Sequence, residues 1–258
     1  MVAIAAVDAP AKPNSPQVNY DLSSSTALYI HWDRVTDQVG PGGLITGYTL
    51  YMDDGYGGRF TEIFSTVGVS SLVTEYLKTG LTLSLTYRFK VIAHNYNSLS
   101  PSAESEIALI PLCTKPSQFA RPTKLSTSMT SIAINWNEPG YNGGCAITGY
   151  AVMVDDGASG SYIEANVDND LAVRQRPSLS TLLITRLQLA NLGQTFRLKV
   201  RAFNLAGETE SPIIGVILAS LPLAPPVPVF VADQSNHQRI TINLSDFNES
   251  TTGGGCAV

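Results

Sequence analysis

Apolar and polar residues alternate along several short segments of this chain. In residues 28–33, the apolar Leu28, Ile30 and Trp32 occupy every second position, and residues 87–93 follow the same pattern. A period of two is typical of a half-buried β-strand, because successive side chains of a strand project to opposite faces. Clusters of Gly, Pro, Asn and Ser separate these segments, which predicts short strands joined by turns and not long helices.

The pattern occurs twice in the chain, at a spacing of about 100 residues. Each copy has a strand ending in tryptophan, at Trp32 and Trp136, and an Ile-Thr-Gly-Tyr segment ending at Tyr48 and Tyr150. Four blocks recur in the same order: 28–33 with 132–137, 42–48 with 143–150, 53–55 with 155–157, and 87–95 with 196–204. Such a repeat indicates two copies of one domain.

A third copy begins near the end of the chain. Residues 239–244 repeat the tryptophan-bearing strand with Leu244 in place of tryptophan, and residues 253–258 repeat the Gly-Gly-Cys block. At the other end, residues 4–13 resemble residues 107–116. The predicted division is the last strand of a preceding domain at 1–11, two complete domains at 12–113 and 114–222, and the N-terminal part of a third, incomplete domain at 223–258.

These motifs resemble those of tandem fibronectin type III domains. The similar features are a proline-rich lead-in, the strand ending in tryptophan, the Ile-Thr-Gly-Tyr strand, and the Tyr-x-Phe-Lys-Val-x-Ala-x-Asn strand at 87–95. The resemblance implies an all-β fold of tandem immunoglobulin-like, seven-stranded β-sandwiches joined by short linkers. The core residues expected in these sandwiches are Trp32, Trp136, Tyr48, Tyr150, Tyr87, Phe196 and Leu81.

One core position differs between the two copies. Leu81 stands six residues before Tyr87, a spacing similar to the tyrosine corner of the family, in which the hydroxyl bonds back to the backbone. The second copy has Phe196 at the position of Tyr87. Because phenylalanine has no hydroxyl, we expect the second copy to depend more on apolar packing at this corner.

Charge and hydropathy exclude two broad classes of partner. Charged residues make up 14% of the 258 residues and the formal net charge is −5, which points to neither nucleic acid nor a membrane surface. Residues 213–232 carry no charge over a length that could span a bilayer, but the four prolines within 222–228 are incompatible with such a helix. We expect a strand there that continues into a proline-stiffened linker. The apolar residues 2–7 are too short for a secretion signal.

The three cysteines, Cys113, Cys145 and Cys256, are odd in number and lack the close spacing of a metal site. Cys145 and Cys256 occupy corresponding places in the repeat, so each domain would hold its cysteine without a partner. We therefore expect free structural thiols, and the redox compartment stays open.

No motif for catalysis or cofactor binding occurs in the sequence. His31 and His94 lie on strands facing away from the predicted core, and His237 precedes a strand, which indicates surface histidines. The glycine clusters at 55–58 and 253–255 lack the following helix that a phosphate site requires. We expect no catalytic residues, no cofactor and no enzymatic activity.

Paired aspartates are the strongest metal candidates. Asp53 and Asp54 recur as Asp155 and Asp156, and each pair is followed by glycine. Adjacent carboxylates can bind calcium, but this ion takes roughly six to eight oxygens and two aspartates supply too few. An Asp-Gly sequence between alternating segments predicts a turn. We therefore favour turns and no metal, with calcium binding by these four residues as the alternative.

The sequence favours a non-enzymatic structural or adhesive protein, a rod-like array of sandwich domains that serves as a spacer and protein-docking surface in an extracellular or cell-surface filament. The expected partners are proteins, including neighbouring copies or domains in a filament, with no nucleic acid and no membrane insertion within this segment. Asn243 and Asn248 fit the pattern for glycosylation, and together with the low charge they favour the outside of the cell.

Three alternative functions stay open. A receptor-type module would bind one specific protein through its loops, such as Asn166–Pro177. The domains could instead be accessories of a distant enzyme. Unpaired cysteines would fit a reducing interior, and therefore an intracellular cytoskeletal or ciliary scaffold. Arg197, Lys199 and Arg201 alternate along one strand face, which indicates either a solvated face or a docking strip.

Overall fold

The computed structural model describes residues 8–36, 43–69, 72–96, 100–165, 171–185, 187, 192–222, 224, 227–244 and 254. The chain divides into two compact units. Unit 1 comprises residues 1–115 together with the segments 142–146 and 204–207, and unit 2 comprises residues 116–141, 147–203 and 208–258. Two loop segments of the second repeat are therefore part of unit 1, which the division at residue 113 did not predict.

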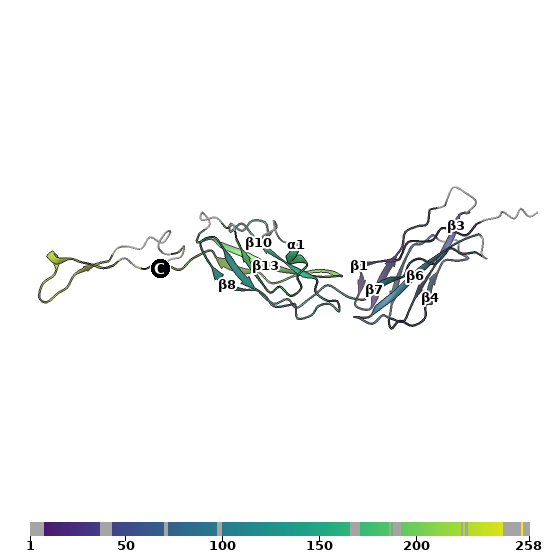
Figure 1. The fold of residues 1–258 in the computed structure, drawn as a ribbon, viewed down its shortest axis with the longest axis horizontal. Coiled ribbons are helices and arrows are strands. Elements are labelled where there is room, and N and C mark those ends of the chain that lie inside the picture. Colours follow the sequence, from purple (N-terminus) through teal and green to yellow (C-terminus); the bar gives the residue numbers. More distant parts are fainter. Residues whose placement is uncertain are drawn as a thin grey trace, which may run out of the picture. The chain divides into compact units, whose positions relative to one another are not determined.

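Unit 1 is a sandwich of two antiparallel sheets (Figure 1). The first sheet contains β1 (Gln17–Ser24), β2 (Ala27–His31) and β5 (Glu75–Thr79), in the order β1-β2-β5. The second contains β3 (Ile45–Met52), β4 (Thr61–Ser65), β6 (Thr86–Asn95) and β7 (Ala108–Pro111), in the order β4-β3-β6-β7. Buried residues from both sheets form one hydrophobic cluster. The prediction of a seven-stranded all-β sandwich is confirmed for this unit.

The central pair of unit 1 shows the predicted period of two. On β3 and β6, Leu50 lies opposite Val91, and both side chains are completely buried. The next pair along, Tyr51 and Lys90, faces outward. This alternation fixes the register, because a shift by one residue would expose the core face of the strand.

Unit 2 repeats this arrangement with two additions. Its first sheet contains β8 (Thr123–Thr127), β9 (Ile132–Asn135) and β12 (Thr181–Ile184), in the order β12-β9-β8. Its second contains β10 (Gly149–Val154), β11 (Ile163–Glu164), β13 (Thr195–Asn204), β14 (Gly207–Glu210) and β15 (Ile214–Ile217), with β14 and β15 both paired to β13. A short helix, α1 (Leu171–Arg174), contacts β10 and was not predicted.

Glycine at the start of β10 permits the close approach of α1. A Cβ atom added at Gly149 would lie 2.0 Å from the carbonyl oxygen of Arg174. The Gly of the Ile-Thr-Gly-Tyr motif is therefore required by packing at this position. α1 has four residues, and no helix in the described part of the chain is long and apolar enough to cross a membrane.

The last strand of the second repeat is interrupted at Ser211, which explains why it forms β14 and β15. The Ser211 amide donates to the carbonyl of Val200 at 2.8 Å, and the Val200 amide donates to the Ser211 hydroxyl at 2.9 Å. The serine hydroxyl thus replaces a backbone acceptor just before Pro212, which has no amide donor. In the first repeat, Ser102 and Ser105 make the same two bonds to β6.

The C-terminal segment forms a small hairpin. The strands β16 (Val229–Phe230) and β17 (Ile242–Asn243) pair in antiparallel fashion, and the 3-10 helix η3 (Ala232–Gln234) lies between them in the sequence. Leu244, which stands in the place of tryptophan, is exposed. The structure assigns this segment to unit 2.

Both tryptophans lie at the centre of their cores. Trp32 packs edge-on against Tyr48 with ring centroids 5.8 Å apart, and Trp136 packs edge-on against Tyr150 at 5.5 Å. Each indole is 3% exposed. All of the expected core residues are buried: Trp32, Trp136, Tyr48, Tyr150, Tyr87, Phe196 and Leu81.

The tyrosine corner is present in unit 1. The Tyr87 hydroxyl accepts a hydrogen bond from the Thr82 amide at 2.8 Å, next to the buried Leu81. Phe196 is buried at the corresponding position of unit 2. We expect Tyr87→Phe to lower the unfolding free energy of unit 1 by about 1 kcal/mol, because the Thr82 amide loses its partner. Urea denaturation would measure this loss, and an unchanged stability of unit 1 in Tyr87→Phe would contradict a contribution from the corner hydrogen bond.

Candidate functional site

The first aspartate of each Asp-Asp-Gly turn is buried and bound to an arginine. The Asp53 carboxylate accepts hydrogen bonds from the Arg88 amide at 2.8 Å, the Gly55 amide at 3.1 Å and the Arg88 Nε at 2.7 Å. Asp155 accepts the Arg197 amide at 2.8 Å and the Arg197 Nε at 2.7 Å. Burial alone would raise the pKa of Asp53, but the hydrogen bonds outweigh burial and lower that pKa below its usual value. Each carboxylate therefore holds its turn against the neighbouring strand.

The second aspartate of each pair is exposed and closes the turn on itself. Asp54 Oδ1 accepts the amides of Tyr56 at 2.9 Å and Gly58 at 3.0 Å, and these bonds lower the pKa of Asp54. Asp156 accepts two backbone amides in the same way. No group of three or more His, Cys, Asp or Glu side chains that could hold a metal occurs among the residues described. Calcium at these positions would have to compete with an arginine and with backbone amides.

The basic strip on β13, which consists of Arg197, Lys199 and Arg201, contacts neighbouring acidic and aromatic side chains. Lys199 and Arg201 both pair with Glu210, at 2.7 Å and 2.8 Å. The Tyr162 ring lies 4.5 Å from the Lys199 Nζ and 5.4 Å from the Arg197 guanidinium carbon. Such cation–π contacts stabilise the strip against the sheet. The strip is therefore partly neutralised before any partner arrives.

The three histidines lie on different segments of the chain, and none belongs to a group of three or more His, Cys, Asp or Glu side chains that could hold a metal among the residues described. His94 is half-buried on β6, and its Nε2 lies 3.0 Å from the Thr49 hydroxyl. Burial lowers the pKa of His94. His31 lies opposite Glu75 on the neighbouring strand, and His237 is exposed. His31 is half-buried like His94, so both are less exposed than the sequence suggested, and only His237 is exposed as expected.

Several predicted positions lie partly or wholly outside the described residues. These are Asn248, Cys256, and residues 166–170 of the loop Asn166–Pro177. Within the rest of that loop, Arg174 forms an ion pair with Glu164. Asn243 lies on β17 and is exposed.

The expectation of free thiols is wrong for two of the three cysteines. Cys113 and Cys145 form a disulfide, with Cα atoms 5.6 Å apart and a sequence separation of 32 residues. Cys113 follows the last strand of the first repeat, and Cys145 lies in a loop of the second repeat. A search for partners within one repeat misses this pair, because the bond joins two consecutive repeats.

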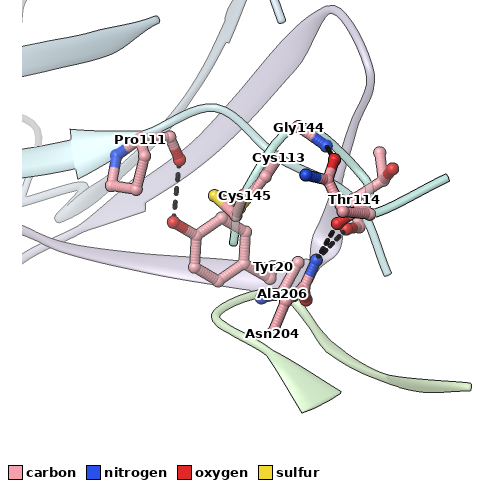
Figure 2. The surroundings of a disulfide bond; sticks show 9 residues. Tyr20, Pro111, Cys113, Thr114, Gly144, Cys145, Asn204 and Ala206 are labelled. Atoms are coloured by element: carbon pink, nitrogen blue, oxygen red, sulfur yellow. Dashed lines mark hydrogen bonds between the residues drawn. A yellow bond between two sulfur atoms is a disulfide. The ribbon is translucent and has the colours of Figure 1, made fainter. Parts of the chain in front are cut away.

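Three hydrogen bonds reinforce the disulfide, which Figure 2 shows between Cys113 and Cys145. The Thr114 amide donates to the Gly143 carbonyl at 2.9 Å. The Asn204 side-chain amide donates to the carbonyls of Thr114 and Asn142, each at 2.8 Å. We call this set of contacts, made by Cys113, Thr114, Asn142, Gly143, Cys145 and Asn204, the clasp. The clasp binds the residues that follow β7 to the loop segments 142–146 and 204–207.

Apolar packing seals one side of the clasp. Cys113, Cys145 and Ala206 form a small buried cluster, and Tyr20 packs against it. The Tyr20 hydroxyl donates to the Pro111 carbonyl at 2.7 Å, and burial raises the pKa of Tyr20 (Figure 2). A cavity of about 220 Å³ adjoins the cluster, and Lys115 on its wall pairs with an exposed aspartate. The disulfide is therefore nearly buried, and Cys113 forms part of the cavity wall.

Gly143 is required for the clasp to close. Its φ is +78°, and an added Cβ would lie 1.9 Å from the Thr114 carbonyl oxygen. We expect Gly143→Ala to lower the unfolding free energy of unit 1 by more than the roughly 1–2 kcal/mol of a left-handed backbone. Gly57→Ala is the control, because Gly57 has φ +81° but no atom within 4 Å of its Cβ position. Equal losses in the two variants, measured by urea denaturation, would contradict a tight clasp.

Comparisons with known proteins agree with the repeat pattern. No family model matches the chain. The chain is 30% identical over 225 residues to "Fibronectin type-III domain-containing protein 3A" of Pongo abelii, which covers 85% of this chain and 17% of that protein. It is also 28% identical over 146 residues to "Exoglucanase B" of Cellulomonas fimi, which covers 54% of this chain and 12% of that protein. The chain thus spans less than a fifth of the length of either relative.

A solved structure shares the fold. The crystal structure of the FN1–FN3 domains of chicken contactin matches with a TM-score of 0.50 and 16% sequence identity. The match covers 82% of this chain and 68% of the contactin chain. At this level of identity the likeness concerns the fold.

Proposed function

Because the chain is a tandem array of fibronectin type III domains, we propose that it is a non-enzymatic spacer and protein-docking segment of an extracellular or cell-surface protein. The domain limits that we propose are 12–113, 114–222 and 223–258, with the clasp spanning the first boundary. Neighbouring copies or domains are the proposed partners.

The clasp is the observation that carries this proposal. A spacer transmits force along the chain, so the point where one repeat gives way to the next needs reinforcement. Here the residues after β7 are held by one disulfide and two hydrogen bonds of Thr114, and a third hydrogen bond joins Asn204 to Asn142. A spacer needs no reactive centre, and the buried aspartates of both units are already occupied by arginines.

The disulfide also supports the proposed location. Structural disulfides form and persist in oxidising compartments and are uncommon in the cytosol. Asn243 is exposed on β17, where a glycan could be attached in a secreted protein. These features favour the cell exterior over an intracellular cytoskeletal or ciliary scaffold. The scaffold alternative rests on unpaired thiols, and two of the three cysteines are paired.

A second candidate function is that of an accessory segment in a secreted enzyme. The likeness to a protein named "Exoglucanase B" favours this candidate, since the matched stretch is 12% of that protein. In this role the domains would still act as spacers, and the catalytic centre would lie in another part of the polypeptide.

Stretching single molecules from their two ends tests the spacer function. We expect a separate force peak for each sandwich. In the oxidised chain the second repeat should release about 100 Å less length than after reduction, because the disulfide withholds 32 residues from extension. Featureless extension of a chain that circular dichroism shows to be folded would contradict a spacer role.

Packing with neighbouring copies has a test of its own. Analytical ultracentrifugation over a wide range of concentrations should show reversible association of the oxidised chain. A monomer at every concentration would contradict association of this segment with its own copies and leave the spacer proposal to the stretching experiment.

A further inference from the structure

The backbone geometry of the clasp occurs a second time in the chain. After the last strand of each repeat, a fully buried leucine is held by two backbone bonds, Leu112 in unit 1 and Leu218 in unit 2. Two residues further on, the Thr114 amide donates to Gly143 at 2.9 Å, and the Ser220 amide donates to Gly254 at 2.9 Å. These bonds place Leu218-Ala219-Ser220 in the role of Leu112-Cys113-Thr114.

The two acceptor glycines agree in conformation as well. Gly143 has φ +78° and Gly254 has φ +70°. An added Cβ would lie 1.9 Å from the Thr114 carbonyl oxygen in the first case and 2.2 Å from the Ser220 carbonyl oxygen in the second. Both positions therefore exclude any side chain for the same steric reason.

The cysteines differ between these two places. Cys145 stands two residues after Gly143, and Cys256 stands two residues after Gly254. Cys113, the partner of Cys145, is replaced by Ala219, which has no thiol. The second occurrence therefore has a cysteine, Cys256, at the position that corresponds to Cys145, and an alanine, Ala219, at the position that corresponds to Cys113.

We propose that the hydrogen-bonded backbone arrangement of the clasp recurs in this chain without a covalent bond, and we call each of its two occurrences a closure. The Cys113–Cys145 disulfide is a covalent lock added to the first closure only. The closure at Ser220 has formed without a disulfide, so hydrogen bonding and the left-handed glycine suffice to shape it. The array consequently contains one locked closure and one releasable closure. This inference does not depend on the proposed function.

A reciprocal exchange tests the proposal. Ala219→Cys gives the second closure the pair of residues found in the first, and Cys113→Ala gives the first closure the pair found in the second. Refolding is carried out with glutathione disulfide, which accepts two electrons and two protons from the two protein thiols and becomes two glutathione thiols. Ala219→Ser is the matched control, since it is similar in size to cysteine and cannot cross-link.

Tryptic mapping reads out the second closure. Cleavage after Arg201 and Arg239 separates residues 202–239 from residues 240–258. We expect these two peptides to be joined in Ala219→Cys and separate in the control. Absence of the link in a folded Ala219→Cys chain would overturn the proposal.

Amide hydrogen exchange measures how much a disulfide stabilises each closure. We expect exchange at Ser220 to slow in Ala219→Cys, and exchange at Thr114 to quicken in Cys113→Ala, each by a factor on the order of 100. In Cys113→Ala, Thr114 should still exchange more slowly than in an unstructured peptide, because the hydrogen bond to Gly143 remains. Complete loss of protection at Thr114 in a variant that is otherwise folded would show that the disulfide shapes the clasp and would overturn the proposal.

Discussion

Trp136→Ala should lower the unfolding free energy of unit 2 by about 4 kcal/mol. The indole is 3% exposed and packs edge-on against Tyr150, so its removal leaves a cavity that the surrounding strands cannot fill. The chain has two tryptophans, and the variant keeps Trp32 as a fluorescent reporter of unit 1. Circular dichroism during urea denaturation would show the early unfolding of unit 2, and Trp32 fluorescence should keep its wild-type midpoint.

Trp136→Phe is the matched control for this experiment. It keeps an aromatic ring and removes the indole nitrogen, which is buried without a hydrogen-bond partner among the residues described. We therefore expect it to cost less than half as much as the alanine variant. A parallel decrease of the Trp32 midpoint in Trp136→Ala would contradict separate cores for the two units.

Arg88→Ala should be the second most damaging substitution, with a loss of about 3 kcal/mol in unit 1. It leaves the Asp53 carboxylate, whose side chain is 1% exposed, without its cation. Two backbone amides still bind that carboxylate, which keeps the loss at the lower end of the range for broken buried pairs. Lys90→Ala on the same strand is the control, and its ion pair with the exposed Glu104 should contribute less than about 1 kcal/mol.

The same pair predicts a dependence on pH. The folded chain lowers the pKa of Asp53, while the unfolded value is about 3.9. A lowered folded pKa contributes stability that is complete above the unfolded value and is lost as the pH falls through the folded value. Wild-type stability should therefore fall below about pH 4. The difference between wild type and Arg88→Ala should narrow there, because protonation removes the unpaired buried charge, and a constant difference from neutral to acid pH would contradict the role of Asp53.

The fold could be predicted from the sequence because its signals are local and repeated. The alternation around Trp32 and the Ile-Thr-Gly-Tyr motif ending at Tyr48 each indicate which face of a strand is buried, and their recurrence around Trp136 and Tyr150 indicates two copies. The spacing of six residues between Leu81 and Tyr87 was sufficient to predict the hydrogen bond of the Tyr87 hydroxyl to the backbone.

The disulfide could not be predicted in this way. Its two cysteines are 32 residues apart and belong to different repeats, so comparing the copies with one another suggested that each thiol was single. The pairing of Cys113 with Cys145 depends on the course of the backbone after β7, and a periodic pattern of apolar residues does not predict that course. A usable signal was present nevertheless, because Cys113 stands two residues after the end of β7 and Cys145 immediately follows the Gly-Gly pair of the next copy.

The aspartate turns were predicted in kind but not in mechanism. An Asp-Gly sequence indicates a turn, and a turn is what Asp54 closes with its own backbone amides. The pattern did not reveal that Asp53 would be buried against Arg88, since the two residues are 35 positions apart. Long-range partners of this kind follow from sheet pairing and are not visible in a local motif.

Mapping the disulfide in the wild-type chain tests the account most directly. Trypsin should release residues 91–124 and 125–174 as separate peptides, because the basic residues at 115 and 121 precede proline. The account predicts that these two peptides are joined through Cys113 and Cys145 in the non-reduced chain, and that the thiol of Cys256 is the one that reacts with an alkylating reagent. Alkylation of Cys113 and Cys145 in the folded, oxidised chain, or a link from either of them to Cys256, would contradict it.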